Sequence, residues 1–282
     1  MNTPSLPAVA SAPYPGFEAV RQLIGDPGVP ERTRMERALV RLARWRQTLL
    51  INTFRTRQGN AVYSGPFAGM HYTQATEGAT LPRLIGCYEA ELHATLLGMR
   101  DVGYDNVVDI GCAEGYYAVG LARLLPDARV FAHDVATSAQ QSCADLAALN
   151  GVADRVRVGG LFDGRELAQL PGRTLVFCDI EGGEAELLDP ARVPALREVD
   201  LIVETHECFR RGLVALLSAR FGASHDIEWI RQSPDAPRVL PDWVFDLSHL
   251  DQILCTWEWR AGPTPWAVMR ARDGQPGERP RA

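Results

Sequence analysis

Short apolar segments alternate with helical segments through the middle of the chain. The buried-strand candidates are residues 106–110, 129–133, 155–158, 174–178 and 200–204. Helical periodicity fills the intervals, at residues 114–125, 137–149, 163–170, 184–188 and 208–220. Apolar strands that alternate with helices are typical of a parallel sheet covered by helices on both faces. The pattern therefore predicts an α/β fold with a doubly wound, Rossmann-like sheet.

Two further apolar segments, 226–231 and 265–271, predict a final antiparallel pair, so that the sheet is seven-stranded and mostly parallel. The tryptophan-rich segment 241–259 lies between them, and we expect it to form a helix or a lid inserted at the edge of the sheet. These segments define a main domain at residues 101–273, followed by a polar tail at 274–282.

The first hundred residues follow a different pattern. Residues 1–29 are rich in proline and predict a flexible arm, and residues 30–100 predict a helical extension with a hairpin. Within this extension, 31–56 shows helical spacing, 61–73 contains turn residues, and 82–100 predicts a helix starting on a proline. The first of these helices has an arginine-rich face. Three roles are open for that face. It is exposed to solvent on a helix that packs against the main domain, it contacts phosphate or nucleic acid, or it forms a dimer contact.

The composition excludes several enzyme classes. None of the 29 basic residues is a lysine, which rules out Schiff-base enzymes, P-loop proteins and protein kinases. The net charge of −6 argues against a general nucleic-acid binder. Six scattered cysteines without a CxxC pair exclude the common zinc knuckles and indicate reduced thiols. With no signal-like N-terminus and no apolar run of ~18–20 residues, we expect a cytoplasmic protein without membrane contact.

A glycine turn follows the first predicted strand. Residues 107–117 read VVDIGCAEGYY, in which Asp109, Gly111 and Gly115 form D-x-G-x-x-x-G rather than G-x-G-x-x-G. A dinucleotide-binding turn needs a second glycine where the backbone approaches the pyrophosphate, and that spacing is missing here. The second predicted strand ends on Asp134, one βαβ unit later, and a carboxylate there can accept hydrogen bonds from both hydroxyls of a diol.

This succession of strand, glycine turn, helix and terminal acid resembles motif I of class I S-adenosylmethionine-dependent methyltransferases, over about residues 105–270. The resemblance implies S-adenosylmethionine as the cofactor, with its ribose hydroxyls on Asp134. It also implies that the adenine lies against residues 160–162, after the third strand. The cofactor-binding residues that it predicts are Asp109, Gly111, Cys112, Gly115, Asp134, Leu161 and Asp179.

Acidic residues and a histidine follow the fourth and fifth predicted strands. Ligands of open α/β sheets bind beyond the carboxyl ends of the strands, so we expect Asp179, Glu181, Glu204 and His206 to converge there. Residues 179–184 (DIEGGE) look like the D-[IV]-E-G-x-E motif of FkbM-type methyltransferases. Many members of that family methylate hydroxyls of sugars or natural products. The resemblance therefore implies O-methylation of a small-molecule acceptor.

Methyl transfer to a hydroxyl requires alignment and one base. His206 matches this role by its intrinsic pKa, and we expect the catalytic residues to be His206, Glu181 and Asp179. Glu181 or Glu204 can also orient the histidine, or act as the base when desolvated. The alternatives are a histidine that caps a strand end and carboxylates that bind backbone amides. We expect no metal; for Mg²⁺, as in catechol-type O-methyltransferases, the candidate ligands are Asp179, Glu204 and His206.

Side chains outside these motifs are expected to shape the pocket. The methionine end of the cofactor is expected to be covered by Tyr88, Glu89 and Glu91. A lid over the site is expected from His71 and Tyr72. The acceptor pocket is expected to be lined by the aromatic rings of Trp243, Trp257, Trp259 and Trp266.

Three other functions remain compatible with the sequence. The first is N- or carboxyl-methylation of an amino acid or peptide. The second is RNA methylation with the helix over 31–56 as a phosphate anchor, and the third is a non-catalytic partner subunit with this fold and no cofactor affinity. The residues after the fourth strand lack the [DN]-P-P-[YF] motif of nucleobase amino methyltransferases. The expected partner is thus a small-molecule acceptor, with a homodimer also compatible and nucleic acid not expected.

Overall fold

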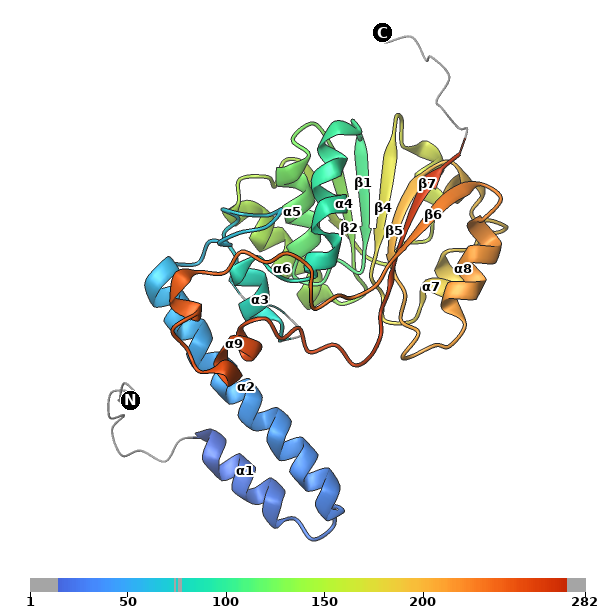
Figure 1. The fold of residues 1–282 in the computed structure, drawn as a ribbon. Helices are drawn as coiled ribbons and strands as arrows, with labels where there is room; N and C mark the ends of the chain where they lie inside the picture. The colour runs from blue at the N-terminus through green and yellow to red at the C-terminus, as the bar shows by residue number, and fades with distance from the viewer. Residues whose placement is uncertain (1–14, 74, 76–77, 273–282) are drawn as a thin grey trace.

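The computed structural model describes residues 15–73, 75 and 78–272, so the predicted tail at 274–282 lies outside the described residues. A seven-stranded sheet in the order β3-β2-β1-β4-β5-β7-β6 forms its centre (Figure 1). β7 runs antiparallel to both of its neighbours, and the remaining pairs are parallel. The strands are β1 (Asn106–Ile110), β2 (Arg129–His133), β3 (Val156–Gly159), β4 (Thr174–Cys178), β5 (Asp200–Glu204), β6 (His225–Ile230) and β7 (Trp266–Ala271).

Helices cover both faces of this sheet, which confirms the predicted doubly wound α/β fold. Neighbouring residues of one strand point to opposite faces, as Val107 and Val108 of β1 show. Val107 packs in the core beneath α5 and α6, whereas Val108 packs in a second core with α8. The helices of the main domain are α5 (Tyr116–Leu124), α6 (Thr137–Leu149), α7 (Glu184–Leu187), α8 (Leu213–Phe221) and α9 (His249–Cys255).

Two antiparallel helices precede the main domain. Residues 15–25, expected within a flexible arm, instead form α1 (Pro15–Gly25), while residues 1–14 lie outside the described part of the chain. Ala19, Val20 and Leu23 are the partly buried apolar residues of α1, which packs along α2 (Glu31–Gln58). Figure 1 shows this pair of helices extending away from the sheet. The predicted helix over 31–56 is confirmed as α2.

The predicted helix over 82–100 is broken, and this expectation was wrong. It divides into α3 (Thr80–Ile85) and α4 (His93–Gly98), joined through a 3₁₀ turn. Gly86 ends α3 at a φ of 80°, and a side chain there would collide with the carbonyl of Ser64 in the preceding hairpin. The close approach of these two segments therefore stops the helix. The hairpin itself forms as predicted, with an antiparallel bridge between Ala61 and His71.

Two shorter predicted helices also differ. The segment 163–170 forms only a 3₁₀ turn at Arg165–Gln169. The helix expected from 208 begins at Leu213, because Gly212 has a φ of 90° and Glu207 accepts hydrogen bonds from backbone amides at its start. Further 3₁₀ turns lie at Ala90–Leu92, Met99–Asp101, Pro194–Arg197 and Asp242–Val244.

The tryptophan-rich segment connects β6 to β7 as expected, but its helix does not lie at the edge of the sheet. Instead, α9 packs against the second half of α2, where Arg46 forms an ion pair of 2.7 Å with Asp251. The indole of Trp259 donates a hydrogen bond of 2.7 Å to Gln47. The segment thus joins α2 to the main domain. Among the described residues, no helix is both long and apolar enough to span a membrane.

Candidate active site

A cavity of about 1070 Å³ opens at the carboxyl ends of the parallel strands. Its walls come from the turns after β1, β2, β3, β4 and β5, and from the segment that leads into β7. This is the position at which open α/β sheets bind ligands. Of the cofactor-binding, catalytic and metal-binding residues predicted from sequence, those that line the cavity are Gly111, Asp134, Leu161, Asp179, Glu181, Glu204 and His206.

The turn after β1 brings the backbone close to the end of β4. Gly111 has a φ of 87°, and a Cβ atom there would collide with the carbonyl oxygen of Asp179. Gly115 has a φ of 95° and packs its Cα against Cys143 of α6. Only glycine satisfies both the left-handed backbone and the close contact. These glycines therefore hold the turn open toward the cavity and keep α5 against α6.

Asp134 ties the turn after β1 to the end of β2. Its carboxylate accepts a hydrogen bond of 3.0 Å from the amide of Ala113 and one of 2.8 Å from the amide of Ala136. Each carboxylate oxygen has a second lone pair. Because Asp134 is partly exposed and lines the cavity, those lone pairs are open to a ligand with paired hydroxyls.

Three predicted cofactor-binding residues, Asp109, Cys112 and Gly115, do not line the cavity. Asp109 is 1% exposed, and burial together with the charge of Asp179 raises its pKa to about 8. A backbone hydrogen bond with Ala118, in the first turn of α5, opposes this rise. These residues thus shape the turn from beneath, and none of them contacts the cavity.

The part of the cavity wall that follows β3 is apolar. Leu161 is 76% exposed, and Phe162 beneath it is buried. His133, a lining residue that the sequence analysis did not single out, packs edge-on against Phe162 with 5.4 Å between ring centroids. Its two ring nitrogens lie 3.0 Å from the carbonyl oxygen of Gly160 and 2.6 Å from Glu166. A flat aromatic group fits between walls of this kind.

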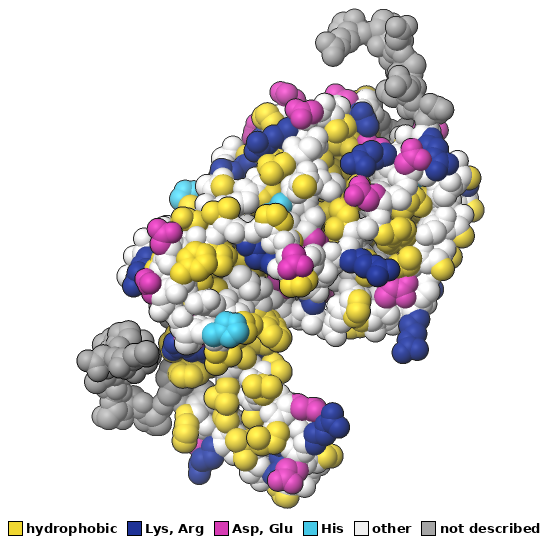
Figure 2. Space-filling model, viewed as in Figure 1, with side chains coloured by type: hydrophobic (Ala, Val, Ile, Leu, Met, Phe, Trp, Pro, Cys, Tyr) yellow, Lys and Arg dark blue, Asp and Glu magenta, His cyan; other side chains and the backbone are white. Residues whose placement is uncertain are grey.

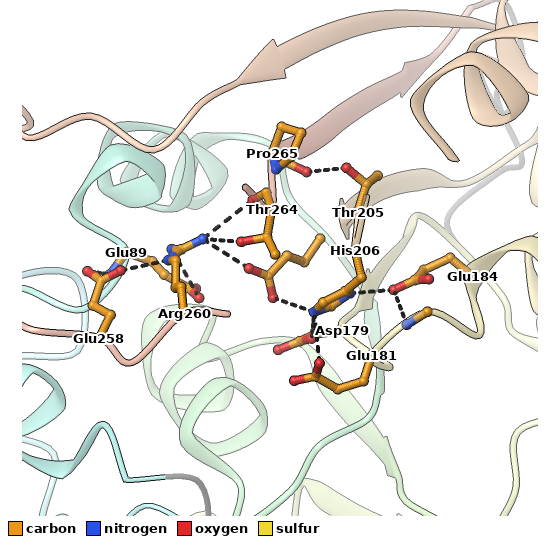
Figure 3. A network of polar contacts seen from close by, with 12 residues as sticks. Glu89, Asp179, Glu181, Glu184, Thr205, His206, Glu258, Arg260, Thr264 and Pro265 are labelled. Carbon is orange, nitrogen blue, oxygen red and sulfur yellow. Dashed lines mark hydrogen bonds and ion pairs between the residues drawn. The ribbon is translucent and has the colours of Figure 1, made fainter. Parts of the chain in front are cut away.

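His206 lies among four carboxylates (Figure 3). Its Nδ1 is 2.7 Å from the fully buried Glu184, and its Nε2 lies 3.4–3.5 Å from Asp179, Glu181 and Glu204. Burial by itself would lower the pKa of the imidazole. The bond to Glu184 and the negative charges of its neighbours outweigh burial, so that the pKa of His206 is raised.

The same group has the spacing of a metal site. One ligand atom from each of Asp179, Glu181 and His206 lies within 4.8 Å of the other two. Glu184, on the far side of the imidazole ring, has the position of the carboxylates that orient metal-binding histidines. The geometry replaces Glu204 of the sequence-based set with Glu181. Glu204 accepts a hydrogen bond of 3.0 Å from an arginine instead.

That arginine, Arg260, is the centre of a second cluster that the sequence analysis missed. It lies in the segment before β7, with its side chain buried, beside the His206 group (Figure 3). Its guanidinium faces four carboxylates: Glu91 at 2.9 Å, Glu258 at 2.8 Å, Glu204 at 3.0 Å and Glu89 at 3.4 Å. One cation cannot neutralise four anions. At Glu89 the effect of burial is therefore larger than that of the Arg260 charge, and the pKa of Glu89 is raised to about 7.

A third cluster, also missed, lies where the glycine turn meets α3. Arg83 and Glu114 form a buried ion pair that includes the hydroxyl of Tyr72. Both Arg83 and Glu114 line the cavity, and the guanidinium lies over the ring of Tyr88 at 4.4 Å. Glu114 occupies one of the variable positions of D-x-G-x-x-x-G. The signal in the sequence that could have identified this cluster is an ionisable residue inside the predicted cofactor-binding turn.

The residues expected to shape the pocket divide into two groups. Tyr88 and Trp259 line the cavity, while Glu89 and Glu91 reach it through Arg260. The others do not line it. Tyr72 is fully buried and His71 pairs its backbone with Asn150, so the predicted lid does not exist in this form. Trp243, Trp257 and Trp266 also lie outside the lining, and Trp266 is fully buried in the core.

No protein-family model and no curated protein sequence matches the chain. The similar solved structures include the O-methyltransferase TomG from Streptomyces achromogenes in complex with SAM, at 18% identity over 65% of this chain and 79% of that one, with a TM-score of 0.44. An O-methyltransferase from Bacillus cereus in complex with SAH has 14% identity over 64% and 80%, with a TM-score of 0.42. A precorrin-6y C5,15-methyltransferase from Geobacter metallireducens has 16% identity over 62% and 86%, with a TM-score of 0.39.

These identities concern the fold alone. The strand order 3-2-1-4-5-7-6 with an antiparallel β7 is that of the methyltransferase Rossmann-like fold. The predicted α/β fold with a doubly wound, mostly parallel seven-stranded sheet is therefore confirmed.

Proposed function

We propose that this protein is an S-adenosylmethionine-dependent methyltransferase of the FkbM type that methylates a hydroxyl of a small molecule. One observation carries the proposal: a carboxylate-backed imidazole, His206, lines the same cavity as the open glycine turn and Asp134. A cofactor with a diol and an acceptor with an ionisable proton fit the two ends of this arrangement.

The residues on the cofactor side fit S-adenosylmethionine. Asp134 has lone pairs for the ribose hydroxyls, and Leu161 with Phe162 offers apolar surface to the adenine. Arg83 pairs with Glu114 of the glycine turn and lines the cavity, and its guanidinium suits the methionine carboxylate. The bound cofactor supplies the methyl group as a sulfonium, whose positive charge matches the acidic wall at Asp179.

His206 acts as the base in this proposal. Glu184 holds Nδ1, which leaves Nε2 directed at the cavity to accept the proton of the acceptor hydroxyl. With the cofactor bound, that oxygen would be held in line with the methyl group that the sulfonium would supply. The imidazole must be neutral to accept the proton. Because its pKa is raised, the rate should increase as the pH rises through that pKa.

The walls on the acceptor side favour an uncharged or cationic small molecule. Asp179, Glu181 and Glu258 line this part together with aromatic rings, and Arg260 is already surrounded by carboxylates. A polyanion such as RNA would be repelled from these walls. An amine remains the second acceptor class, because a carboxylate and an aromatic ring also bind an ammonium group.

A divalent cation is the second candidate ligand for the His206 group. The 4.8 Å spacing of three ligand atoms and the position of Glu184 favour it. In that case His206 would bind the ion rather than the proton. Titration of the protein with Mn²⁺, followed by its electron paramagnetic resonance signal, separates the two roles. Tight binding that His206→Ala abolishes supports the ion, and methyl transfer that resists a chelator supports the base.

Calorimetry with S-adenosylmethionine is the first test of the function. We expect binding by the wild type and loss of binding by Asp134→Ala; no binding by the folded wild type would favour the non-catalytic subunit. The second test follows a labelled methyl group from the cofactor into a panel of sugars, phenols, amines, peptides and RNA. Labelled RNA, with binding that weakens steeply as salt rises, would contradict the proposed acceptor class. Full turnover by both His206→Ala and Glu181→Ala would contradict the assignment of the base.

A further inference from the structure

The first half of α2 and all of α1 form a helical pair that projects from the main domain (Figure 1), here called the α1–α2 hairpin (residues 15–45). The second half of α2 differs, because Gln47, Leu50 and Phe54 are buried against the main domain. The second half of α2 is therefore packed against the main domain, and its first half lies outside the core.

The projecting half has an apolar stripe exposed to solvent. Met35, Leu39 and Leu42 recur at i, i+4 and i+7, the spacing of a helix–helix contact, and are 61%, 70% and 47% exposed. On α1, Phe17 is 69% exposed and Ile24 is 46% exposed. Figure 2 shows hydrophobic side chains gathered over this hairpin. An apolar stripe that is exposed to water does not stabilise a helix pair. The position of this stripe therefore indicates a contact surface.

Arg37, Arg41 and Arg44 point away from this stripe, and the arginines nearer to it, Arg32, Arg34 and Arg46, are already held by Glu36, the carbonyl of Ile24 and Asp251. At about 100° per residue, Leu39 and Leu42 lie within roughly 40° of Met35, whereas Arg37, Arg41 and Arg44 lie roughly 180–240° from it. A lipid surface binds amphipathic helices whose cations border the apolar face. Here a partner that covers the stripe leaves these arginines in water. The partner is therefore apolar and helical rather than a membrane or a nucleic acid.

The exposed area is of the size that a dimer requires. The stripe and the two α1 side chains together expose on the order of 550 Å² of apolar surface, at about 150–250 Å² for a complete aromatic side chain. A stable interface buries about 800 Å² per partner, of which about 65% is apolar in homodimers. One hairpin laid on a second, identical hairpin satisfies that requirement without any other surface.

We propose that the α1–α2 hairpin binds the same hairpin of a second copy of this chain, which forms a four-helix contact around Met35, Leu39 and Leu42. The contact is isologous, because the same stripe serves both copies. It stands independently of the proposed methyltransferase function. The proposed contact also fixes one end of α2. Farther along the same helix, Gln47 accepts the hydrogen bond of Trp259, which lines the cavity.

Light scattering after size-exclusion chromatography tests the proposal at about 50 µM protein, a concentration above the ~1 µM dissociation constant of a modest interface. We expect the wild type to elute as a dimer and Leu39→Glu as a folded monomer. Val40→Glu is the matched control, since Val40 is 45% exposed on the same helix but lies roughly 140° from Met35. It should remain a dimer.

Circular dichroism checks that both variants retain the wild-type helix content. A monomeric wild type, or a Leu39→Glu variant that is still dimeric, would overturn the proposal. So would dissociation by both substitutions to the same extent, since that would place the contact off the stripe. Co-sedimentation of monomeric wild type with anionic phosphatidylserine vesicles would replace the second copy by a lipid surface.

Discussion

The two ends of the cavity are built in different ways. At the proposed cofactor end, Asp134 is held by the amides of Ala113, three residues after β1, and Ala136, three residues after β2. At the proposed acceptor end, Arg260 holds Glu91, 169 positions earlier in the chain. The first end is set by local backbone geometry. The second exists only when distant segments have folded together.

This difference also concerns charge. Backbone amides satisfy Asp134 without a cation, and the carboxylate stays open to a ligand. The acidic groups around Arg260 and His206 outnumber their cations, and burial raises the pKa values of Glu89, Glu204 and Asp179. The acceptor end is thus short of positive charge, and a cationic or proton-donating ligand relieves this imbalance.

The largest effect should follow removal of the shared cation. Arg260→Leu leaves four buried carboxylates without their partner, so we expect a loss of about 3–5 kcal/mol in the free energy of unfolding. Urea denaturation measures it. The loss should be greater at pH 8 than at pH 6, because protonated carboxylates no longer repel one another.

Arg270→Leu is the matched control for this substitution. Arg270 also pairs with a glutamate near β7, but both side chains are more than half exposed and lie 3.7 Å apart. Its removal should change the free energy of unfolding by less than about 0.5 kcal/mol. Equal losses in the two variants would mean that the buried cluster contributes no more than a surface pair.

The next largest effect concerns the turn at the cofactor end. Gly111→Ala adds a methyl group against the carbonyl of Asp179 and places alanine at a φ of 87°. We expect a loss of about 2–4 kcal/mol from the combined strain and collision. Gly103→Ala is the control, since Gly103 has a φ of 75° but no atom within 4 Å of the added Cβ. It should lose only about 1 kcal/mol; an equal loss would show that the contact with Asp179 costs nothing.

Local patterns also explain which features were predictable from sequence. The strands and the Asp109–Gly115 turn lie close to their predicted positions, because hydrophobic periodicity and glycine geometry act over a few residues. Asp134 follows from the end of its own strand. The broken helix at Gly86 was not predictable in this way, because its cause is a collision with Ser64, 22 residues earlier.

The acceptor end was only half predictable for the same reason. Asp179, Glu181, Glu204 and His206 follow parallel strands, and topology alone brings them together. Arg260 lies in an irregular segment with no periodicity, and nothing local marks it as the partner of four carboxylates. Glu184 was not predicted as a catalytic residue, because the sequence places it in a short helix, yet it is the fully buried partner of His206.

A smaller effect is expected for the diol site. Asp134→Asn keeps the shape of the side chain but exchanges one acceptor oxygen for a donor, so S-adenosylmethionine should bind about 10–100-fold more weakly, which corresponds to about 1.4–2.7 kcal/mol. Calorimetry measures the change. Asp163→Asn removes a charge from the rim of the same cavity and should change the affinity less than threefold, about 0.6 kcal/mol. Similar losses in both would assign the effect to overall charge rather than to the diol.

The smallest effect tests how Glu184 acts through His206. Glu184→Gln removes the negative charge next to Nδ1 while keeping an oxygen that can accept its hydrogen, so the raised pKa of His206 should fall toward its ordinary value. The pH at which the imidazole becomes neutral then moves downward. Both the NMR titration of His206 and the rising limb of the methyl-transfer rate should move with it.

Glu186→Gln supplies the comparison, because Glu186 is exposed, two positions away, and pairs with Arg210 instead of the imidazole. It should leave both midpoints in place. A packing role for Glu184 would lower stability or rate at every pH without moving the midpoint. A shift of the midpoint in the Glu184 variant alone therefore identifies it as a positioning residue, one whose charge sets the proton affinity of the base from outside the cavity.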